Sequence, residues 1–203
     1  MATAINDKAR DADRTRQAIL FAAQQIFAEK GFAEAGVRDI TARAGVNPSL
    51  VSRYFGGKLK LFEAALDAAL DARMMTDLPK QGFGRAIMAR FADEEKGRVQ
   101  PLPILFGAAP DSEARAVALR LLHDHVLAPL SEWFGGEAGE VKAAAFMVVS
   151  LGFFTYRDQL PLRQFAGPVE PGLRRWLEDT FQAIVDDYAR HVTALPCRSR
   201  SDI

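Results

Sequence analysis

Cysteine is nearly absent from this chain, which has one thiol, Cys197, among 203 residues. A single cysteine excludes an internal disulfide framework and a zinc site built from several cysteines. The longest apolar run, Ala143 to Phe154, is interrupted by Ser150 and Gly152, and a bilayer span needs about 20 apolar residues. The N-terminus lacks the apolar core of a signal peptide. We therefore expect a protein of the reducing cytoplasm, with no membrane partner, no metal and no cofactor.

The chain also lacks an excess of charge of either sign, because 26 Lys and Arg balance 26 Asp and Glu. Bulk charge therefore does not indicate a nucleic-acid partner. The distribution is uneven, since residues 1–60 hold ten Lys or Arg against six Asp or Glu. A positive N-terminal end beside a negative remainder is typical of a DNA-contacting part joined to a body that DNA does not attract. Chance is the alternative reading for a split of this size.

Alternating strand patterns and internal repeats are missing too, and the chain reads as helices separated by glycines and prolines. The sequence predicts an all-α protein with an N-terminal helix-turn-helix head of three helices on a larger helical body for ligand binding and dimerisation. The predicted parts are a flexible arm (1–13), a DNA-binding domain (14–58), a regulatory and dimerisation domain (59–193) and a flexible tail (194–203). In the body, helices are predicted over 83–95, 102–108, 112–134, 138–159 and 171–193.

Three helix boundaries carry specific expectations. The first helix is predicted from about Arg14 to Lys30, where Gly31 stops it. A helix beginning near Lys58 is expected to reach Met74 or Met75, before a proline disfavours helical geometry. The proline inside 112–134 is Pro129, and it is expected to kink that helix or to begin a new turn.

Residues 36–58 are the most informative stretch, because they predict two short helices joined by a tight turn. Val37, Ile40 and Ala44 recur at helical spacing, and a following glycine, Gly45, ends that helix in the left-handed conformation. The next helix begins with Asn47 as cap and Pro48 at its first position, where the missing N–H costs nothing. This is the helix-turn-helix pattern, whose second helix can lie in the DNA major groove.

The second helix of this pattern is too polar on one side to be ordinary core. Val51 and Phe55, four residues apart, form its buried face. Its other sides carry Ser49, Ser52, Arg53 and Tyr54, and Lys58 follows just past its end. Hydroxyl, phenol and cationic groups on one exposed surface suit contacts with phosphates and base edges. The alternative is a pair of amphipathic surface helices that bind no DNA.

Two helices near the C-terminus need partners for their apolar surface. The stretch from Ala143 to Tyr156 is apolar nearly all round, and 171–193 carries a continuous apolar stripe. A helix that is apolar on several faces must be buried on several faces. We therefore expect a homodimer formed through 138–159 and 171–193, with a purely intramolecular core as the alternative.

The first 65 or so residues resemble a TetR-family transcriptional regulator. The matching motifs, in family order and spacing, are Phe27-Ala28-Glu29-Lys30-Gly31-Phe32, Val37-Arg38-Asp39-Ile40, Ala44-Gly45-Val46, Tyr54-Phe55, Lys58 and Leu61-Phe62. The resemblance implies an all-α homodimer that binds a pseudo-palindromic double-stranded DNA operator. It also implies a repressor that a small, largely apolar effector releases from the operator.

The resemblance also implies roles for individual residues. Arg38 matches a position that reaches a base edge, where its two-pronged donor suits guanine. The residues at the reading end of the recognition helix are Pro48, Ser49 and Leu50, and those at phosphate-contacting positions are Asn47, Tyr54 and Lys58. Two departures from the family pattern bear on these contacts. Ser52 stands where the family often has tyrosine, and Gly36 stands where it often has a hydroxyl cap.

Phenylalanine is abundant, with 14 residues, most of them outside the head. Ligand sites are usually apolar with a few polar anchors. The candidate pocket consists of Met74, Phe83, Ile87, Phe91, Phe106, His123, Phe146, Phe153, Tyr156 and Arg157. The alternative for any single one of these residues is plain core.

Two further classes of function are alternatives to a regulator. The enzyme hypothesis starts from His123-Asp124-His125, but histidines two apart point about 200° away from each other on a helix and share a metal poorly. Gly82-Phe83-Gly84 is only a fragment of a dinucleotide-binding motif and follows no strand. The sequence therefore favours a protein that is not an enzyme. The other alternative is a helical ligand-binding or protein-interaction module without specific DNA binding.

Overall fold

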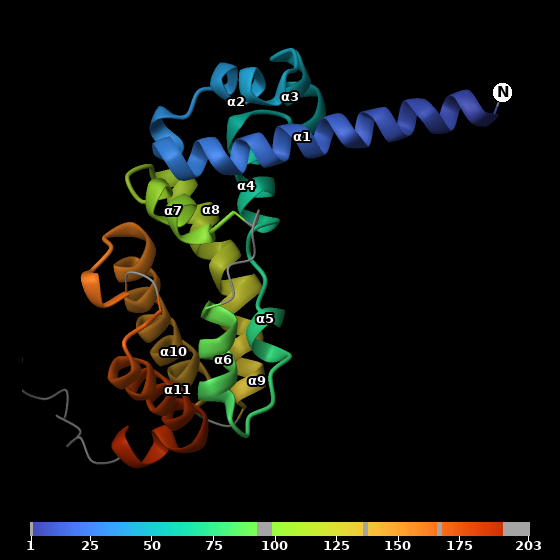
Figure 1. The fold of residues 1–203 in the computed structure, drawn as a ribbon. Helices are drawn as coiled ribbons and strands as arrows, with labels where there is room; N and C mark the ends of the chain where they lie inside the picture. The colour runs from blue at the N-terminus through green and yellow to red at the C-terminus, as the bar shows by residue number, and fades with distance from the viewer. Residues whose placement is uncertain (1, 93–98, 136–137, 166–167, 193–203) are drawn as a thin grey trace, which may run out of the picture. The chain divides into compact units, whose positions relative to one another are not determined.

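The computed structural model describes residues 2–92, 99–135, 138–165 and 168–192. Every element within these ranges is helical, which confirms the all-α prediction (Figure 1). The α-helices are α1 (Ala2–Glu34), α2 (Val37–Ala44), α3 (Ser49–Phe55), α4 (Lys58–Asp67), α5 (Arg73–Thr76), α6 (Phe83–Ala92), α7 (Pro101–Ala108), α8 (Ser112–Leu122), α9 (Ala128–Phe134), α10 (Gly139–Phe154) and α11 (Pro171–Val192). Two π-turns, η1 (His123–Leu127) and η2 (Thr155–Gln159), and a 3₁₀ turn, η3 (Arg163–Phe165), complete the described elements. The predicted tail and Cys197 lie outside the described residues.

The chain forms two compact units, Met1–Asp71 with Lys96–Val126, and Ala72–Glu95 with Leu127–Ile203. In the first unit, α2 and α3 lie on one side of the long helix α1 (Figure 1), while α7 packs along α1 and α8 packs on α4. The first unit therefore contains the helix-turn-helix together with α7, α8 and nearly all of α4, which lie in the range 59–193 that the sequence assigns to the body.

Three phenylalanines hold the core of the first unit together. Phe27, Phe32 and Phe62 are buried, and the ring of Phe62 meets the other two edge-on at centroid distances of 5.3 and 5.2 Å. The apolar positions predicted for the first helix, Ile19, Ala23, Ile26 and Phe27, are all buried. The buried face of α1 predicted from the helical spacing of these residues is therefore confirmed.

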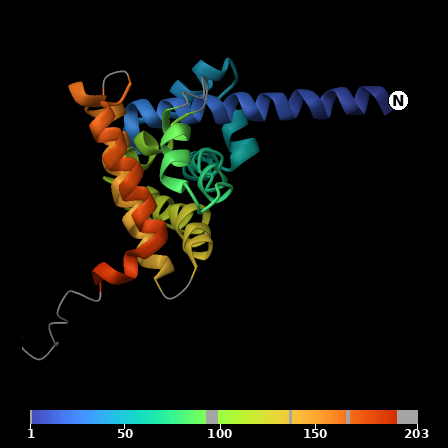
Figure 2. The ribbon, with the colours of Figure 1, turned by 60° about the horizontal axis from the view of Figure 1, so that its bottom comes forward.

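In the second unit, α6 packs on α11, and α10 packs on both α9 and α11. Figure 2 shows α10 and α11 running side by side. Their shared core is aromatic, with the ring of Phe146 5.2 Å from that of Phe181 and 5.9 Å from that of Phe83. All three rings are fully buried.

Two predicted helix limits are wrong. The first helix begins at Ala2 instead of Arg14, so residues 2–13 are helical where a flexible arm was expected. No Gly or Pro interrupts these residues, and their alanines and basic residues are good helix formers. The helix from Lys58 ends at Asp67, well before Met74, and α5 is a separate short helix. The break lies where the chain leaves the first unit, in a stretch whose local sequence favours a continuous helix.

Two other boundary predictions are confirmed. Gly31 has the non-helical angles φ 72° and ψ 171°, so the regular helix stops there even though a final turn follows. Pro129 lies in the first turn of α9, directly after the π-turn η1. Proline lacks the N–H that would continue the α-helical ladder, and the wider turn before it accommodates that loss.

Candidate nucleic-acid interface

The turn between α2 and α3 is built as the sequence predicts. Gly45 adopts φ 67° and ψ 33°, which is the left-handed conformation that glycine reaches without strain. The backbone N–H of Val46 donates to the carbonyl of Thr41 at 2.9 Å, which satisfies an end group of α2. The chain is thereby turned sharply into α3.

Asn47 caps α3. Its side-chain oxygen accepts from the backbone N–H of Ser49 at 2.9 Å and from the Ser49 hydroxyl at 2.8 Å. Pro48 has the helical angles φ −54° and ψ −30°, as expected for the first helical position. The amide nitrogen of Asn47 has no role in this cap, so it is the group that can donate to a phosphate.

The two sides of α3 differ as the sequence indicates. Val51 and Phe55 are buried, whereas the residues that face solvent are Pro48, Ser49, Ser52 and Arg53. Leu50 and Tyr54 are half-buried, and the guanidinium of Arg53 lies 6.0 Å from the centre of the Tyr54 ring. The exposed face of α3 therefore carries small hydroxyl groups and a cation, and it is not packed against the core.

Helix α2 is attached to α1 by two ion pairs that sequence reasoning missed. The Lys30 ammonium lies 2.7 Å from the Asp39 carboxylate, and both guanidinium nitrogens of Arg43 donate to Glu29, at 2.6 and 2.8 Å. The exposed side chain of Arg38 has no ion pair among the described residues. The two ion pairs lie on one side of α2, and the Arg38 side chain on another side is free to contact a ligand such as DNA.

The carboxylates in these pairs are perturbed. The hydrogen bond from Lys30 lowers the pKa of Asp39, and the backbone N–H of Gly36 contributes in the same direction. Asp39 therefore supplies half of a capping box for α2, where the glycine cap itself has no side chain to offer. The hydrogen bond from Arg43 lowers the pKa of Glu29. Both acids remain ionised at neutral pH, which maintains the attachment of α2.

Lys58 is engaged within the chain. Its ammonium donates to the carbonyl of Ala33 at 3.3 Å and lies 4.5 Å from the centre of the Phe32 ring. The side chain is half-buried at the first residue of α4. A contact between Lys58 and phosphate stays a prediction, and it requires the ammonium to leave or share these partners.

Residues 19–65 match the family model for bacterial regulatory proteins of the tetR family, and residues 81–185 match that for a tetracyclin repressor-like C-terminal domain. The second match alone covers more than half of the chain. This protein belongs to the TetR family.

Curated relatives of this TetR-family chain resemble part of it. It is 54% identical over 93 residues to the HTH-type transcriptional repressor Rv3405c of Mycobacterium tuberculosis, covering 44% of this chain and 46% of that protein. It is 40% identical over 60 residues to the HTH-type transcriptional repressor NicS of Pseudomonas putida, covering 30% and 28%. The match thus spans less than half the length of these two relatives.

Solved structures share the fold over more of the chain. A TetR-family regulator from Streptomyces coelicolor is 26% identical, with a TM-score of 0.53 over 86% of this chain and 96% of its own. NalD of Pseudomonas aeruginosa, described as the secondary repressor of the MexAB-OprM multidrug efflux pump, is 21% identical, with a TM-score of 0.60 over 87% and 100%. The likeness to NalD concerns the fold alone.

Half of the residues predicted for a ligand pocket of this TetR-family chain come together in the second unit. Phe83, Ile87, Phe91, Phe146 and Phe153 are all at least 96% buried. The Phe91 ring lies 5.6 Å from that of Phe153 and 6.5 Å from that of Phe146. The rings contact one another, so an apolar ligand would have to separate them.

Arg157 closes one end of this aromatic cluster. Its guanidinium donates to the carbonyl of Phe91, pairs with Asp158 at 2.7 Å, and lies 5.2 Å from the centre of the Phe153 ring. Tyr156 beside it is exposed. Arg157 is therefore the one predicted polar anchor that the structure brings to the apolar residues.

The remaining pocket candidates lie elsewhere. Phe106 and His123 belong to the first unit, where both are exposed, and His123 pairs with its neighbour Asp124 at 2.9 Å. Met74 is half-buried in α5. Sequence could not separate Met74 and Phe106 from the cluster, because apolar side chains on short helices look alike whichever core they enter.

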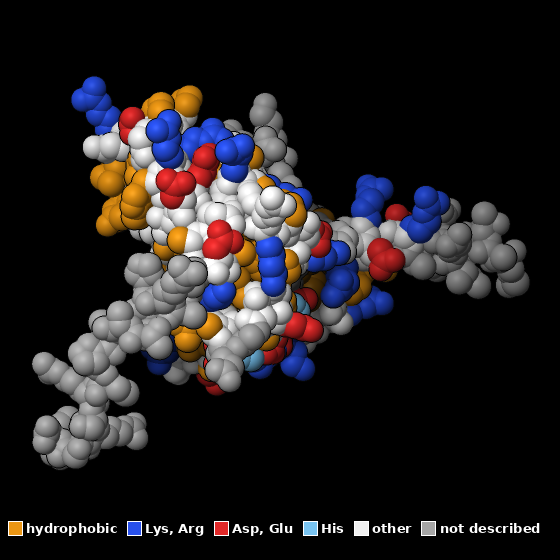
Figure 3. Space-filling view, turned by 90° about the horizontal axis from the view of Figure 1, so that it is seen from below, with side chains coloured by type: hydrophobic (Ala, Val, Ile, Leu, Met, Phe, Trp, Pro, Cys, Tyr) orange, Lys and Arg blue, Asp and Glu red, His pale blue; other side chains and the backbone are white. Residues whose placement is uncertain are grey.

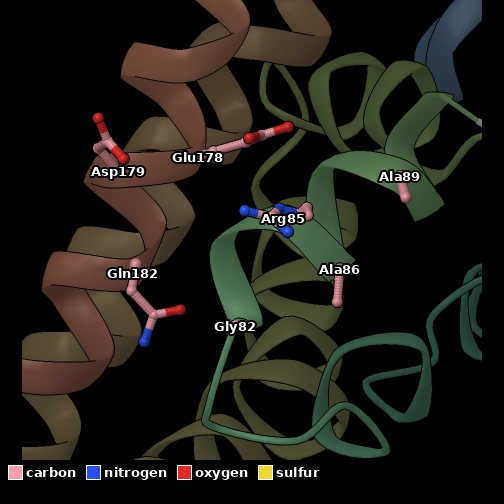
Figure 4. A pocket seen from close by; sticks show the side chains of 7 residues that line it. All are labelled: Gly82, Arg85, Ala86, Ala89, Glu178, Asp179 and Gln182. Atoms are coloured by element: carbon pink, nitrogen blue, oxygen red, sulfur yellow. The ribbon is translucent and has the colours of Figure 1, made fainter.

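An open groove of about 600 Å³ lies between α6 and α11 (Figure 4). It is lined by Gly82, Arg85, Ala86, Ala89, Glu178, Asp179 and Gln182, none of which was predicted. Gly84 explains how close the two helices come, since a Cβ there would lie 1.9 Å from the carbonyl oxygen of Glu178. This helix contact accounts for Gly84 of the dinucleotide-like fragment, while Gly82 has a positive φ of 72° and open space around it.

In the described part of the chain, none of the helices is long and apolar enough to cross a membrane. Over the same residues, no group of three or more His, Cys, Asp or Glu side chains is placed to hold a metal ion.

Proposed function

We propose that this protein is a sequence-specific DNA-binding transcriptional regulator, and more specifically a repressor. The observation that carries the proposal is the outward face of α3, where Ser49, Ser52 and Arg53 are exposed behind a capped N-terminus. The names of its curated relatives support the same function. A regulator of bacterial genes works where the chromosome lies, so we propose a cytoplasmic location.

Specific roles follow for the residues at the candidate nucleic-acid interface. Arg38 reads a guanine, because its guanidinium is exposed and uncommitted and can donate twice to one base edge. Pro48 and Leu50 offer apolar contact to a thymine methyl group. Ser49 belongs to the reading end of the helix with Pro48 and Leu50. The residues proposed to position the helix on phosphates are Asn47, Ser52, Tyr54 and Lys58. The DNA-reading part then ends near Lys58, inside the first compact unit.

A second copy of the chain is needed to read a pseudo-palindrome, and we propose that it packs on α10 and α11. Large apolar side chains on these helices face solvent in the single chain, namely Val141, Val148 and Leu151 on α10 and Trp176 on α11. Exposed hydrophobic side chains are visible on the face shown in Figure 3. Burying the apolar side chains of α10 and α11 against a second copy stabilises the dimer by about 25 cal/mol per Å² of apolar surface.

In this dimer, two α3 helices enter successive major grooves about 34–36 Å apart. An effector acts by favouring a body conformation in which that separation is wrong. It can shift the equilibrium only by its difference in affinity for the two states. We propose the aromatic cluster of Phe91, Phe146 and Phe153 as its site, with Arg157 as the polar anchor.

Selection of bound fragments from random and genomic DNA, with competitor DNA at about 150 mM salt, tests this function. Recovery of a pseudo-palindrome is the expected result. Binding that weakens with salt but is the same for every DNA sequence would mean that the protein contacts phosphates without reading bases. No binding by a folded dimer would overturn the proposal and favour a protein-interaction module.

A further inference from the structure

The hydroxyl of Ser150 is a buried polar group without a partner. Ser150 lies on α10 and is 6% exposed, and its Oγ atom has no hydrogen-bond partner in the described part of the chain. A serine inside a helix often donates to the carbonyl four residues earlier, here that of Phe146, but Ser150 does not. Because an unpaired buried hydroxyl lowers stability, its presence in a core needs an explanation.

The surroundings of Ser150 are aromatic. Phe146 and Phe153 lie about one turn before and one turn after it on the same face of α10, and both rings are buried. The Phe91 ring of α6 lies 6.5 Å from that of Phe146 and 5.6 Å from that of Phe153. Phe91 thus bridges the two rings that flank the hydroxyl, so Ser150 belongs to the aromatic cluster proposed as the effector site.

Arg157 supplies a second polar group to this cluster. Its guanidinium lies 5.2 Å from the centre of the Phe153 ring and 4.8 Å from that of Phe154. These rings follow Ser150 by about one turn, which is on the order of 5 Å along the helix axis. The hydroxyl and the guanidinium are therefore separated by roughly the width of one aromatic ring.

The charge of Arg157 is already balanced, but its donors are not all used. Two of its N–H groups donate to Asp158 and one donates to the carbonyl of Phe91. A guanidinium has five such donors, so two remain for a ligand. A neutral acceptor can use these two donors, whereas a carboxylate would have to compete with Asp158.

We propose that the effector is a neutral aromatic molecule with hydrogen-bonding groups on opposite sides of its ring, one for Ser150 and one for Arg157. This inference rests on the proposed function, whose effector site it specifies. A phenolic hydroxyl fits Ser150, because both groups can donate and accept. A carbonyl oxygen fits the remaining donors of Arg157. The ligand ring takes a place among the phenylalanine rings, which separate to admit it.

Calorimetric titration of the full-length protein with 4-hydroxyacetophenone and with acetophenone tests the bond to Ser150, since the two probes differ only in the phenolic hydroxyl. We expect the wild type to bind 4-hydroxyacetophenone about 3- to 10-fold tighter, the range for one hydrogen bond. Ser150→Ala is expected to lose this preference. The matched control is Ser112→Ala, which removes an exposed hydroxyl from α8 in the first unit and should keep it.

The melting temperature of the free protein gives a readout that needs no ligand. Removal of an unpaired buried hydroxyl relieves its desolvation cost, so Ser150→Ala should melt a few degrees above the wild type. A lower melting temperature would show that the hydroxyl is already bonded within the free protein, and it would overturn the inference.

The charge of the ligand is tested with 4-hydroxybenzoate, which carries a carboxylate in place of the acetyl group. We expect it to bind more weakly than 4-hydroxyacetophenone, and tighter binding would overturn the neutral class. The inference also fails if the wild type binds neither ketone at millimolar concentration, binds both equally, or shares its preference with Ser150→Ala.

These titrations are made without DNA, so they fail independently of the proposed function. A protein that selects a pseudo-palindrome but shows no preference dependent on Ser150 keeps the proposed function and loses the inference. A protein that shows the preference but binds no DNA keeps the ligand site and loses the function of a regulator.

Discussion

Gly31 and Gly107 bring the backbones of α1 and α7 into direct contact. A Cβ atom on Gly107 would lie 2.6 Å from the Cα of Gly31, and a Cβ on Gly31 would lie 3.0 Å from the carbonyl oxygen of Gly107. Gly31 also has a φ of 72°, which few other residues adopt. This crossing joins the end of the first helix to a helix some 70 positions later in the sequence.

Gly107→Ala should destabilise the first unit, because backbone atoms cannot yield to the added methyl group. Overpacking of this kind costs about 1–3 kcal/mol, which a thermal melt would record as a fall of several degrees. Gly152→Ala is the control, since a methyl there meets no atom within 4 Å and alanine favours a helix interior. An equal melting temperature for Gly107→Ala and the wild type would contradict the close contact.

Arg38→Ala should weaken operator binding by about 1–3 kcal/mol and relax the preference at one base pair. The reason is that a bidentate contact to guanine is lost while the phosphate contacts stay. Binding to a panel of single-base operator variants measures the change. A uniform loss on every variant would show that Arg38 contacts phosphate and reads no base.

Lys58→Ala should weaken binding to all sequences and reduce the slope of log affinity against log salt by about one. Affinities between about 50 and 200 mM salt give that slope. Because Lys58 also contacts Ala33 and Phe32 within the chain, the melting temperature of the variant is measured alongside. An unchanged slope would mean that the ammonium keeps its internal partners when DNA is bound.

Val148→Glu should split the dimer, because Val148 is 71% exposed in the single chain and a charge buried without a partner is costly. We expect the dimer dissociation constant to rise about tenfold or more, measured by analytical ultracentrifugation. The matched control is Leu119→Glu, which changes a residue 61% exposed on α8, away from the proposed interface. Equal effects of both variants would argue against α10 as the interface.

The ion pair between Lys30 and Asp39, one of the contacts that attach α2 to α1, should weaken in acid. The pKa of Asp39 lies below its ordinary value of 3.8 because of Lys30, so the stability it contributes is present above about pH 4 and is lost as pH falls through the lowered pKa. The melting temperatures of the wild type and Asp39→Asn should therefore differ at pH 7 and converge in acid. A difference that stays constant down to about pH 2 would contradict this assignment.

Local sequence predicted much of the candidate interface. The cap by Asn47, the left-handed Gly45 and the buried pair Val51 and Phe55 all depend on neighbours within a few residues. The partners of Lys58 and the ion pair between Glu29 and Arg43 were missed, because each joins residues 14 or more positions apart. Spacing within one helix carries no information about such pairs.

The sequence by itself determined the helical class, the turn between α2 and α3 and the polar face of α3, because helical periodicity, caps and glycine conformations are local properties. Only the tertiary structure decided that α7 and α8 pack with α1 and α4, that the helix from Lys58 ends at Asp67, and that Phe106 and Phe146 enter different environments. These outcomes depend on which apolar faces find each other across long separations in the chain, and many pairings satisfy the same local pattern.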